Sequence, residues 1–165
     1  AEPYVAFKKN WQRDYNRNSA SLSSNVTTSD MERIKTGVRE LFMEVFTEEL
    51  TAGGYTLATE RADDVLIVKP SIINLDVIAP DIRSASRNTS FASSAGSMTL
   101  YMELYDSVTD DLLAKALDPT RDRDNSVMQW QSSVANRAAA KRMMKPWAVA
   151  LVRGLDQSRE VTKSE

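Results

Sequence analysis

The sequence predicts an α+β fold, a two-layer α/β sandwich in which a mixed β-sheet carries two helices on one face. Apolar residues recur at steps of three and four in two long segments, they alternate in others, and short polar turns separate the segments. The expected order of elements is β-α-β-β-β-β-α. At 165 residues the chain should form one domain, which we place at residues 1–157, with a polar tail at 158–165.

The first strand and the first helix have clear signals. Tyr4–Phe7 is a short apolar run that predicts a strand, and a cationic stretch and a polar loop follow it. Ser29 and Glu32 have the spacing of a capping box, so the helix should begin there. Gly53-Gly54 should end it, because glycine readily adopts the left-handed conformation at a helix C-terminus. The expected buried face of this helix is Met31, Ile34, Val38, Leu41, Phe42, Val45, Phe46 and Leu50.

Two strand predictions follow, at residues 55–59 and 65–78. The second run contains Pro70, which cannot donate a hydrogen bond to a ladder. That strand should therefore be an edge strand, or be bulged or broken at Pro70. Residues 79–96 are rich in serine and poor in apolar residues, which predicts a long loop.

The second half of the chain should supply a hairpin and the last helix. Residues 98–105 alternate strictly, which places Met98, Leu100, Met102 and Leu104 on one face of a strand. A turn at 106–111 leads to the hairpin partner at 112–117, and residues 118–131 read as a polar, charged segment. The last helix should cover residues 133–157, with a kink or break at Pro146.

Composition excludes several kinds of chemistry. The chain has no Cys and no His, so it can form no disulfide, no Cys/His zinc site and no Ser-His-Asp triad. Its 21 Lys and Arg against 23 Asp and Glu give a net charge of −2, which argues against a nucleic-acid binder. The sequence contains no apolar run long enough to span a membrane, and its first residues do not resemble a signal peptide.

The acidic residues do not indicate an active site or a metal site. Catalytic carboxylates need two different environments, whereas adjacent acids on turns are usually solvated. We interpret the pairs Asp63/Asp64, Asp110/Asp111 and Glu48/Glu49 in this way. Residues 118–125 do not fit a calcium-binding loop, and Arg121 and Arg123 would oppose a cation. We therefore predict a charged surface loop there, and no metal, cofactor or catalytic residue.

Two segments are candidates for contact with a partner. The cationic stretch contributes Lys8, Lys9, Trp11 and Arg13, and the serine-rich loop contributes Arg83, Arg87 and Phe91. A solvated face is the simplest interpretation of the cationic stretch, and contact with an anionic membrane surface is an alternative. The serines of the loop have no His to activate them as nucleophiles.

Four stretches carry a family resemblance: DVLIVKPSIINLD at 64–76, GSMTLYMELYDS at 96–107, DSVTDDLLA at 106–114 and KPWAVALVR at 145–153. Together they make the chain resemble a family of bacterial envelope lipoproteins catalogued as domain of unknown function 3313. The resemblance implies a Gram-negative source, a removed signal peptide and a lipidated Cys upstream of Ala1. It implies no reaction and no catalytic residue.

These observations favour a non-catalytic, periplasm-facing lipoprotein of the outer membrane, which acts as an accessory or interaction module on another envelope protein. Nucleic acid is not an expected partner, and the sequence does not indicate an oligomeric state. Two alternatives stay open. A carboxylate-based cell-wall hydrolase needs two acids flanking a cleft, and a small-molecule or lipid binder needs a sizeable apolar pocket.

Overall fold

The computed structural model describes residues 1–18, 25–78, 90–92, 96–122, 129–131 and 133–162. Four strands form the main sheet in the order β1-β2-β4-β5: Tyr4–Phe7, Leu66–Val77, Gly96–Asp106 and Leu112–Arg121. β1 runs parallel to β2, and the other neighbours are antiparallel, so the sheet is mixed. Two short strands, β3 (Ser90–Ala92) and β6 (Gln129–Gln131), pair separately.

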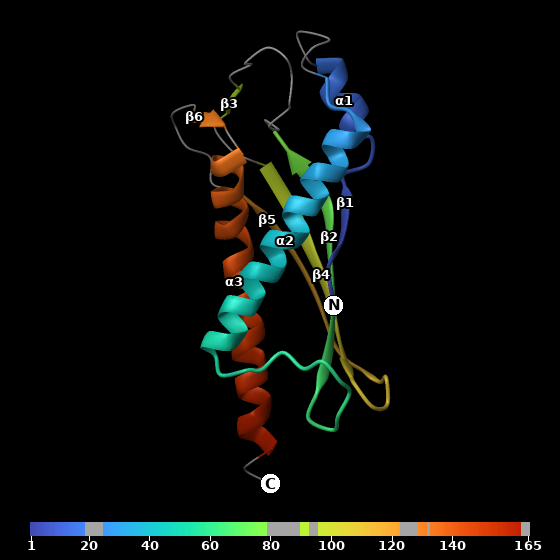
Figure 1. The fold of residues 1–165 in the computed structure, drawn as a ribbon, viewed down its shortest axis with the longest axis vertical. Helices are drawn as coiled ribbons and strands as arrows, with labels where there is room; N and C mark the ends of the chain where they lie inside the picture. The colour runs from blue at the N-terminus through green and yellow to red at the C-terminus, as the bar shows by residue number, and fades with distance from the viewer. Residues whose placement is uncertain (19–24, 79–89, 93–95, 123–128, 132, 163–165) are drawn as a thin grey trace.

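Two long helices cover one face of the main sheet. α2 (Thr28–Ala52) and α3 (Ser133–Thr162) lie side by side and cross the strands (Figure 1). Ion pairs join them, among which Glu49–Lys145 measures 2.9 Å. The core lies between these helices and the sheet, and its most buried members are Val5, Leu41, Phe42, Val45, Ile72, Met98, Leu100, Met144 and Ala148. The predicted α+β architecture, with helices packed on one face of a mixed sheet, is confirmed.

The described residues form three helices, whereas we expected two. α1 (Trp11–Asn18) forms in the cationic stretch after β1, so the order of the main elements is β-α-α-β-β-β-α. The strand expected at residues 55–59 is wrong. After α2, Tyr55 instead reaches α3, where its hydroxyl donates to Asp156 Oδ1 at 2.7 Å and its ring lies under Arg159.

β2 is an interior strand, so the expectation of an edge strand at Pro70 is wrong. Pro70 is buried and lies opposite Met102 of β4. Ser107 N donates to Val65 O, so odd-numbered residues of β2 bond to β4, and Pro70 points its nitrogen toward β1. The β1 ladder begins only at Ser71, so the missing N–H breaks no ladder bond. The irregularity of β2 lies further along, between Ile73 and Asp76.

The capping box of α2 lies two residues earlier than predicted. Thr27 is the N-cap: its Oγ1 accepts from Asp30 N at 3.1 Å, and Thr27 N donates to Asp30 Oδ2 at 2.9 Å. Burial raises the pKa of Asp30, but hydrogen bonds from Thr27 and Arg33 outweigh that effect and the pKa is lowered. Gly53-Gly54 ends the helix as expected, and Gly54 takes the left-handed conformation with φ +80°.

This assignment predicts a difference between two neighbouring substitutions. Thr27→Ala should lower the free energy of unfolding by about 1 kcal/mol, because it removes the N-cap acceptor. Ser29→Ala should change it by less than about 0.5 kcal/mol, since Ser29 lies within the first turn. Urea denaturation followed by circular dichroism measures both. A larger loss for Ser29→Ala than for Thr27→Ala would contradict the cap.

α3 continues through Pro146 as one helix, so the prediction of a break there is wrong. A proline at 146 leaves the carbonyl of Arg142 without its helical donor. Both residues are exposed, so that carbonyl can bond to water. Trp147 and Ala148, next to the proline, are buried and hold the helix against the sheet. The helix continues to Thr162, past residue 157, where we expected it to end.

The hairpin predictions are confirmed and extended. Met98, Leu100 and Met102 face the core, and Leu104 packs against it. β5 runs to Arg121, four residues beyond its expected end, and it includes Pro119. The loop expected at residues 79–96 contains the short strand β3, which pairs with β6.

Candidate functional site

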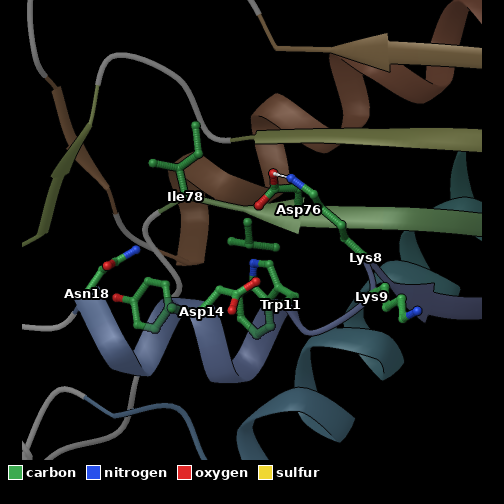
Figure 2. Close-up of a pocket in the computed structure, with 9 residues that line it drawn as sticks. Lys8, Lys9, Trp11, Asp14, Asn18, Asp76 and Ile78 are labelled. Carbon is green, nitrogen blue, oxygen red and sulfur yellow. Dashed lines mark hydrogen bonds and ion pairs between the residues drawn. The ribbon is translucent and has the colours of Figure 1, made fainter.

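The predicted cationic stretch forms the junction between β1 and α1, and two surface hollows flank it. We call residues 8–18 together with the end of β2 the junction site. The first hollow has a volume of about 410 Å³ and lies between α1 and the end of β2 (Figure 2). The second, of about 420 Å³, lies beside Phe7, Arg13 and Lys35. Asn10, with φ 61°, makes the turn from strand to helix.

An aromatic stack supports the junction site. Phe7 and Trp11 have ring centroids 4.3 Å apart, and Trp11 and Tyr15 are 5.6 Å apart. Trp11 is only 5% exposed, and burial raises the pKa of Tyr15. Gln12 donates to the carbonyl of Val26 at 2.9 Å, which ties α1 to the start of α2. The stack therefore sets the position of α1 by packing.

Two carboxylates line the first hollow from opposite elements. Asp14 comes from α1 and Asp76 from β2 (Figure 2). Asp76 Oδ2 lies 3.5 Å from Lys8 Nζ, and Asp14 Oδ1 lies 3.0 Å from Arg13 Nη2. Each acid thus has its own cation, and the Asp14 side chain is 54% exposed. The hollow is mixed in character, since Trp11, Tyr15, Val77 and Ile78 also line it.

The structure separates the predicted contact residues. Lys8, Lys9 and Arg13 are surface residues at the junction site, whereas Trp11 is a packing residue beneath them. Arg83 and Arg87 lie outside the described residues. Phe91 is described only as a strand position, opposite Trp130.

Five of the acidic candidates have structural partners. Asp110 pairs with Arg61 at 2.9 Å, Glu48 with Lys141 at 3.1 Å and Glu49 with Lys145. Asp118 belongs to β5, and its Oδ2 accepts from Trp147 Nε1 at 2.6 Å. Asp122 is 5% exposed and pairs with Arg142 at 2.8 Å, so a surface loop is the wrong description of it. Within the described part of the chain, no three acidic residues gather as a metal site would require.

Sequence reasoning missed the second face of the sheet, which no described helix covers. The register places Tyr4, Ser71, Tyr101 and Leu117 in one row across the four strands on that face. Tyr4 and Leu117 are each 65% exposed. We call this surface the open face; it comprises Tyr4, Ile67, Lys69, Ser71, Ile73, Thr99, Tyr101, Glu103, Tyr105, Leu112, Lys115, Leu117 and Pro119. The alternation in residues 98–105 gave the two faces of β4, but not which face would stay uncovered.

A polar network fixes the middle of the open face. Glu103 accepts hydrogen bonds from the hydroxyls of Tyr101, at 2.5 Å, and Tyr105, at 2.7 Å, and pairs with Lys115 at 3.3 Å. Lys69 Nζ lies 4.1 Å from the centre of the Tyr105 ring. The bonds from Tyr101 and Tyr105 lower the pKa of Glu103 to about 2. The network therefore holds two tyrosine rings in fixed positions on an exposed surface.

The Glu103 network predicts how stability depends on pH. Because the folded pKa is about 2 against an ordinary 4.5, its contribution is complete above pH 4.5 and is lost as the pH falls toward 2. In that window Glu103→Gln should lose less stability than the wild-type chain. Thermal unfolding at pH 2.5, 3.5, 4.5 and 6 measures the difference, with Asp14→Asn as the matched control. Parallel pH profiles for Glu103→Gln and wild type would contradict the network.

None of the described helices combines the length and hydropathy that crossing a bilayer requires.

Comparison with solved structures gives distant similarities. A Xanthomonas campestris protein of family DUF330 has 14% identity and a TM-score of 0.41, over 73% of this chain and 64% of that one. This chain thus spans just under two thirds of that protein. A Caulobacter crescentus CB15 structure described as "a putative lipoprotein" has 15% identity and a TM-score of 0.35, over 78% of this chain and 85% of that one.

No curated protein matches the sequence. A family model does match, over residues 13–151, which is most of the chain. The matched range contains the four stretches that carry the resemblance, except for the last two residues of KPWAVALVR. The chain belongs to the family described as protein of unknown function DUF3313.

Proposed function

We propose that this chain is a non-catalytic protein-interaction module of the bacterial cell envelope, and that the open face is its contact surface. One observation carries the proposal: on a sheet face left uncovered by the described helices, a row of side chains crosses the four strands and has an exposed aromatic residue at one end and an exposed aliphatic residue at the other. Tyr4 and Leu117 lie at its two ends, each 65% exposed. Grouped apolar side chains on a surface are typical of a place where another molecule binds.

The chemistry of the open face suits a protein partner. Tyrosines are enriched in protein interfaces, because one ring offers both apolar area and a polar hydroxyl. Tyr101 and Tyr105 are held by Glu103, so binding would not need to order them. Lys69 and Lys115 add positive charge around the rings.

The cellular setting follows from the family resemblance. We propose that the chain faces the periplasm and is attached to the outer membrane through a lipidated Cys upstream of Ala1. The partner is then another envelope protein. The junction site, with Lys8, Lys9 and Arg13 on its surface, lies at the far end of β1 from Ala1 and offers a second place of contact.

Site-specific photo-crosslinking of the full-length lipoprotein in cells tests this function. A photoreactive residue at Tyr4 should give a discrete adduct with one envelope protein, because Tyr4 lies on the open face. The same residue at Glu40, exposed on α2, is the matched control and should give none. Adducts from Glu40 but not from Tyr4, or adducts from neither, would contradict the proposal.

A carboxylate-based cell-wall hydrolase is the second candidate, and the first hollow favours it, since Asp14 and Asp76 both line that hollow. Retaining and inverting glycosidases use two acids, one of which is kept protonated by its surroundings. Here each acid is paired with a cation of its own, Asp76 with Lys8 and Asp14 with Arg13. Release of soluble fragments from purified peptidoglycan, abolished by Asp14→Asn or Asp76→Asn, would establish this activity. Wild type should release none.

A small-molecule or lipid binder is the third candidate. The two hollows at the junction site have volumes within the range of ligand sites, but charged side chains form much of their lining. A lipid tail would need an apolar cavity. Native mass spectrometry of the protein purified from its own envelope should therefore show no lipid bound to it non-covalently.

A further inference from the structure

The strand β5 is a long free edge of the main sheet. It covers ten residues, Leu112–Arg121, and only β4 pairs with it among the described elements. β1, at the opposite edge, has four residues. A long exposed edge presents a row of backbone donors and acceptors that another strand can pair with, and proteins usually protect such edges.

The hydrogen bonds at the two ends of the β4–β5 ladder show which backbone groups of β5 point toward β4 and which point away. Asp122 N donates to Gly96 O at 2.9 Å, and Asp106 N donates to Asp111 O at 2.9 Å. Even-numbered residues of β4 therefore bond to β5. With the register Leu104↔Ala114 to Met98↔Thr120, the even-numbered residues of β5 are their partners. The backbone groups of Lys115, Leu117 and Pro119 consequently point away from the sheet.

The placement of Pro119 agrees with this pattern. A proline fits an edge strand where its missing N–H would face outward. Pro119 occupies such a position, so its missing N–H removes no hydrogen bond from the β4–β5 ladder. The outward donors are then the N–H groups of Lys115, Leu117 and Arg121, and the outward acceptors are the carbonyls of Lys115, Leu117, Pro119 and Arg121.

The same odd-numbered residues carry their side chains on the open face. Leu117 is 65% exposed, the Lys115 side chain is 52% exposed, and Arg121 is exposed. β5 thus offers an apolar residue between two cations along its free edge, and no acidic residue of its own on that face. The nearest carboxylate there is Glu103 of β4, which pairs with Lys115.

We propose that an extended segment of the partner protein adds to β5 as a fifth strand of the sheet. Its residue opposite Leu117 is apolar, and its residues opposite Lys115 and Arg121 are acidic. Cross-strand neighbours on one face interact most strongly when they are both apolar or of opposite charge. A second copy of this chain is a poorer occupant, because it brings its own Lys115 and Arg121 to the same face. This inference rests on the proposed function, and it names the surface and the chemistry of the partner.

A synthetic peptide tests the inference. The probe is Thr-Glu-Thr-Val-Thr-Val-Thr-Glu-Thr with blocked ends and a fluorophore, which reads the same in both directions and so fits either strand orientation. Fluorescence anisotropy with the 165-residue chain should show saturable binding. Leu117→Pro removes one outward N–H and should weaken binding about tenfold or more, whereas Leu117→Ala, the matched control, keeps the N–H and should weaken it less.

Two further arms separate backbone pairing from charge. The probe with the nitrogens of both valines and of the threonine between them methylated should bind about tenfold more weakly, because these methyl groups block pairing with the edge in either strand orientation. Arg121→Glu should weaken binding of the probe and strengthen binding of a version in which both Glu are Lys. These arms do not require Leu117→Pro to fold.

Three outcomes would overturn the addition of a partner strand: no binding of the probe to wild type, equal binding of the methylated and unmethylated probes, or a dimer in analytical ultracentrifugation that Leu117→Pro dissociates. The last would identify a second copy as the occupant. If Tyr4 still gives an adduct with an envelope protein, any of these results leaves the proposed function standing and excludes only a partner strand at β5.

Discussion

Ala116→Pro should destabilise the chain by roughly 2–4 kcal/mol, whereas Leu117→Pro should leave it folded and within about 1 kcal/mol of wild type. The two residues are neighbours on β5, but their backbone groups point in opposite directions. Ala116 lies opposite Met102 in a hydrogen-bonded pair, so a proline there removes a ladder bond inside the sheet. The nitrogen of Leu117 points outward, as the nitrogen of Pro119 does, so a proline at 117 removes no bond to β4.

Urea denaturation of the two variants measures this difference, with Ala116→Ser and Leu117→Ser as controls for side-chain loss. Each serine variant keeps the backbone N–H at the substituted position, so it should be at least as stable as the proline variant at that position. Equal losses of stability in Ala116→Pro and Leu117→Pro would contradict the register from which the free edge is derived.

Ile72→Ala should lower the free energy of unfolding by about 2–5 kcal/mol, because it opens a cavity in the core. Ile72 is fully buried and lies opposite Leu100 of β4 and Val5 of β1, both in the core. Ile73→Ala is the matched control, since the next residue along the strand faces the open face and is only partly buried. It should cost less than about 1.5 kcal/mol.

The comparison of Ile72 and Ile73 checks which face of the sheet is covered. Thermal unfolding of Ile72→Ala, Ile73→Ala and wild type at pH 7 gives the order of the three midpoints. A larger loss for Ile73→Ala would mean that the open face is packed against something in the folded chain, and the proposed contact surface would then be buried.

Much of the fold could be predicted because its signals are local. The three- and four-residue spacing from Ile34 to Leu50 defines the buried face of α2, and the alternation from Met98 to Leu104 defines that of β4. The cap of α2 was misplaced because Ser29/Glu32 and Thr27/Asp30 are both satisfactory pairs in sequence. Only the burial of Asp30, with Arg33 beside it, selects the pair Thr27/Asp30.

Other elements depend on contacts between distant parts of the chain. The stretch around Trp11 forms a helix because its ring stacks between Phe7 and Tyr15 and because Gln12 reaches Val26. Pro70 is tolerated in an interior strand because β1 begins to pair just after it. Neither reason can be read from the residues near Trp11 or Pro70 alone.

The candidate site follows the same division. Lys8, Lys9 and Arg13 could be predicted as surface cations from composition, whereas the burial of Trp11 required the stack. Predicting the open face requires knowledge of the strand order. Tyr4, Tyr101 and Leu117 come from three separate strands, and they form a row only because the order is β1-β2-β4-β5.

Amide hydrogen exchange along β5, followed by nuclear magnetic resonance, tests the central claim most directly. In the free chain the amides of Ala114 and Ala116 should exchange slowly, since they bond to β4, and those of Lys115 and Leu117 should exchange rapidly. Saturating concentrations of the Thr-Glu-Thr-Val-Thr-Val-Thr-Glu-Thr probe should slow Lys115 and Leu117 while leaving Ala114 and Ala116 unchanged. Unchanged exchange at Lys115 and Leu117 in the complex, or slowing confined to the junction site, would contradict the addition of a strand to this edge.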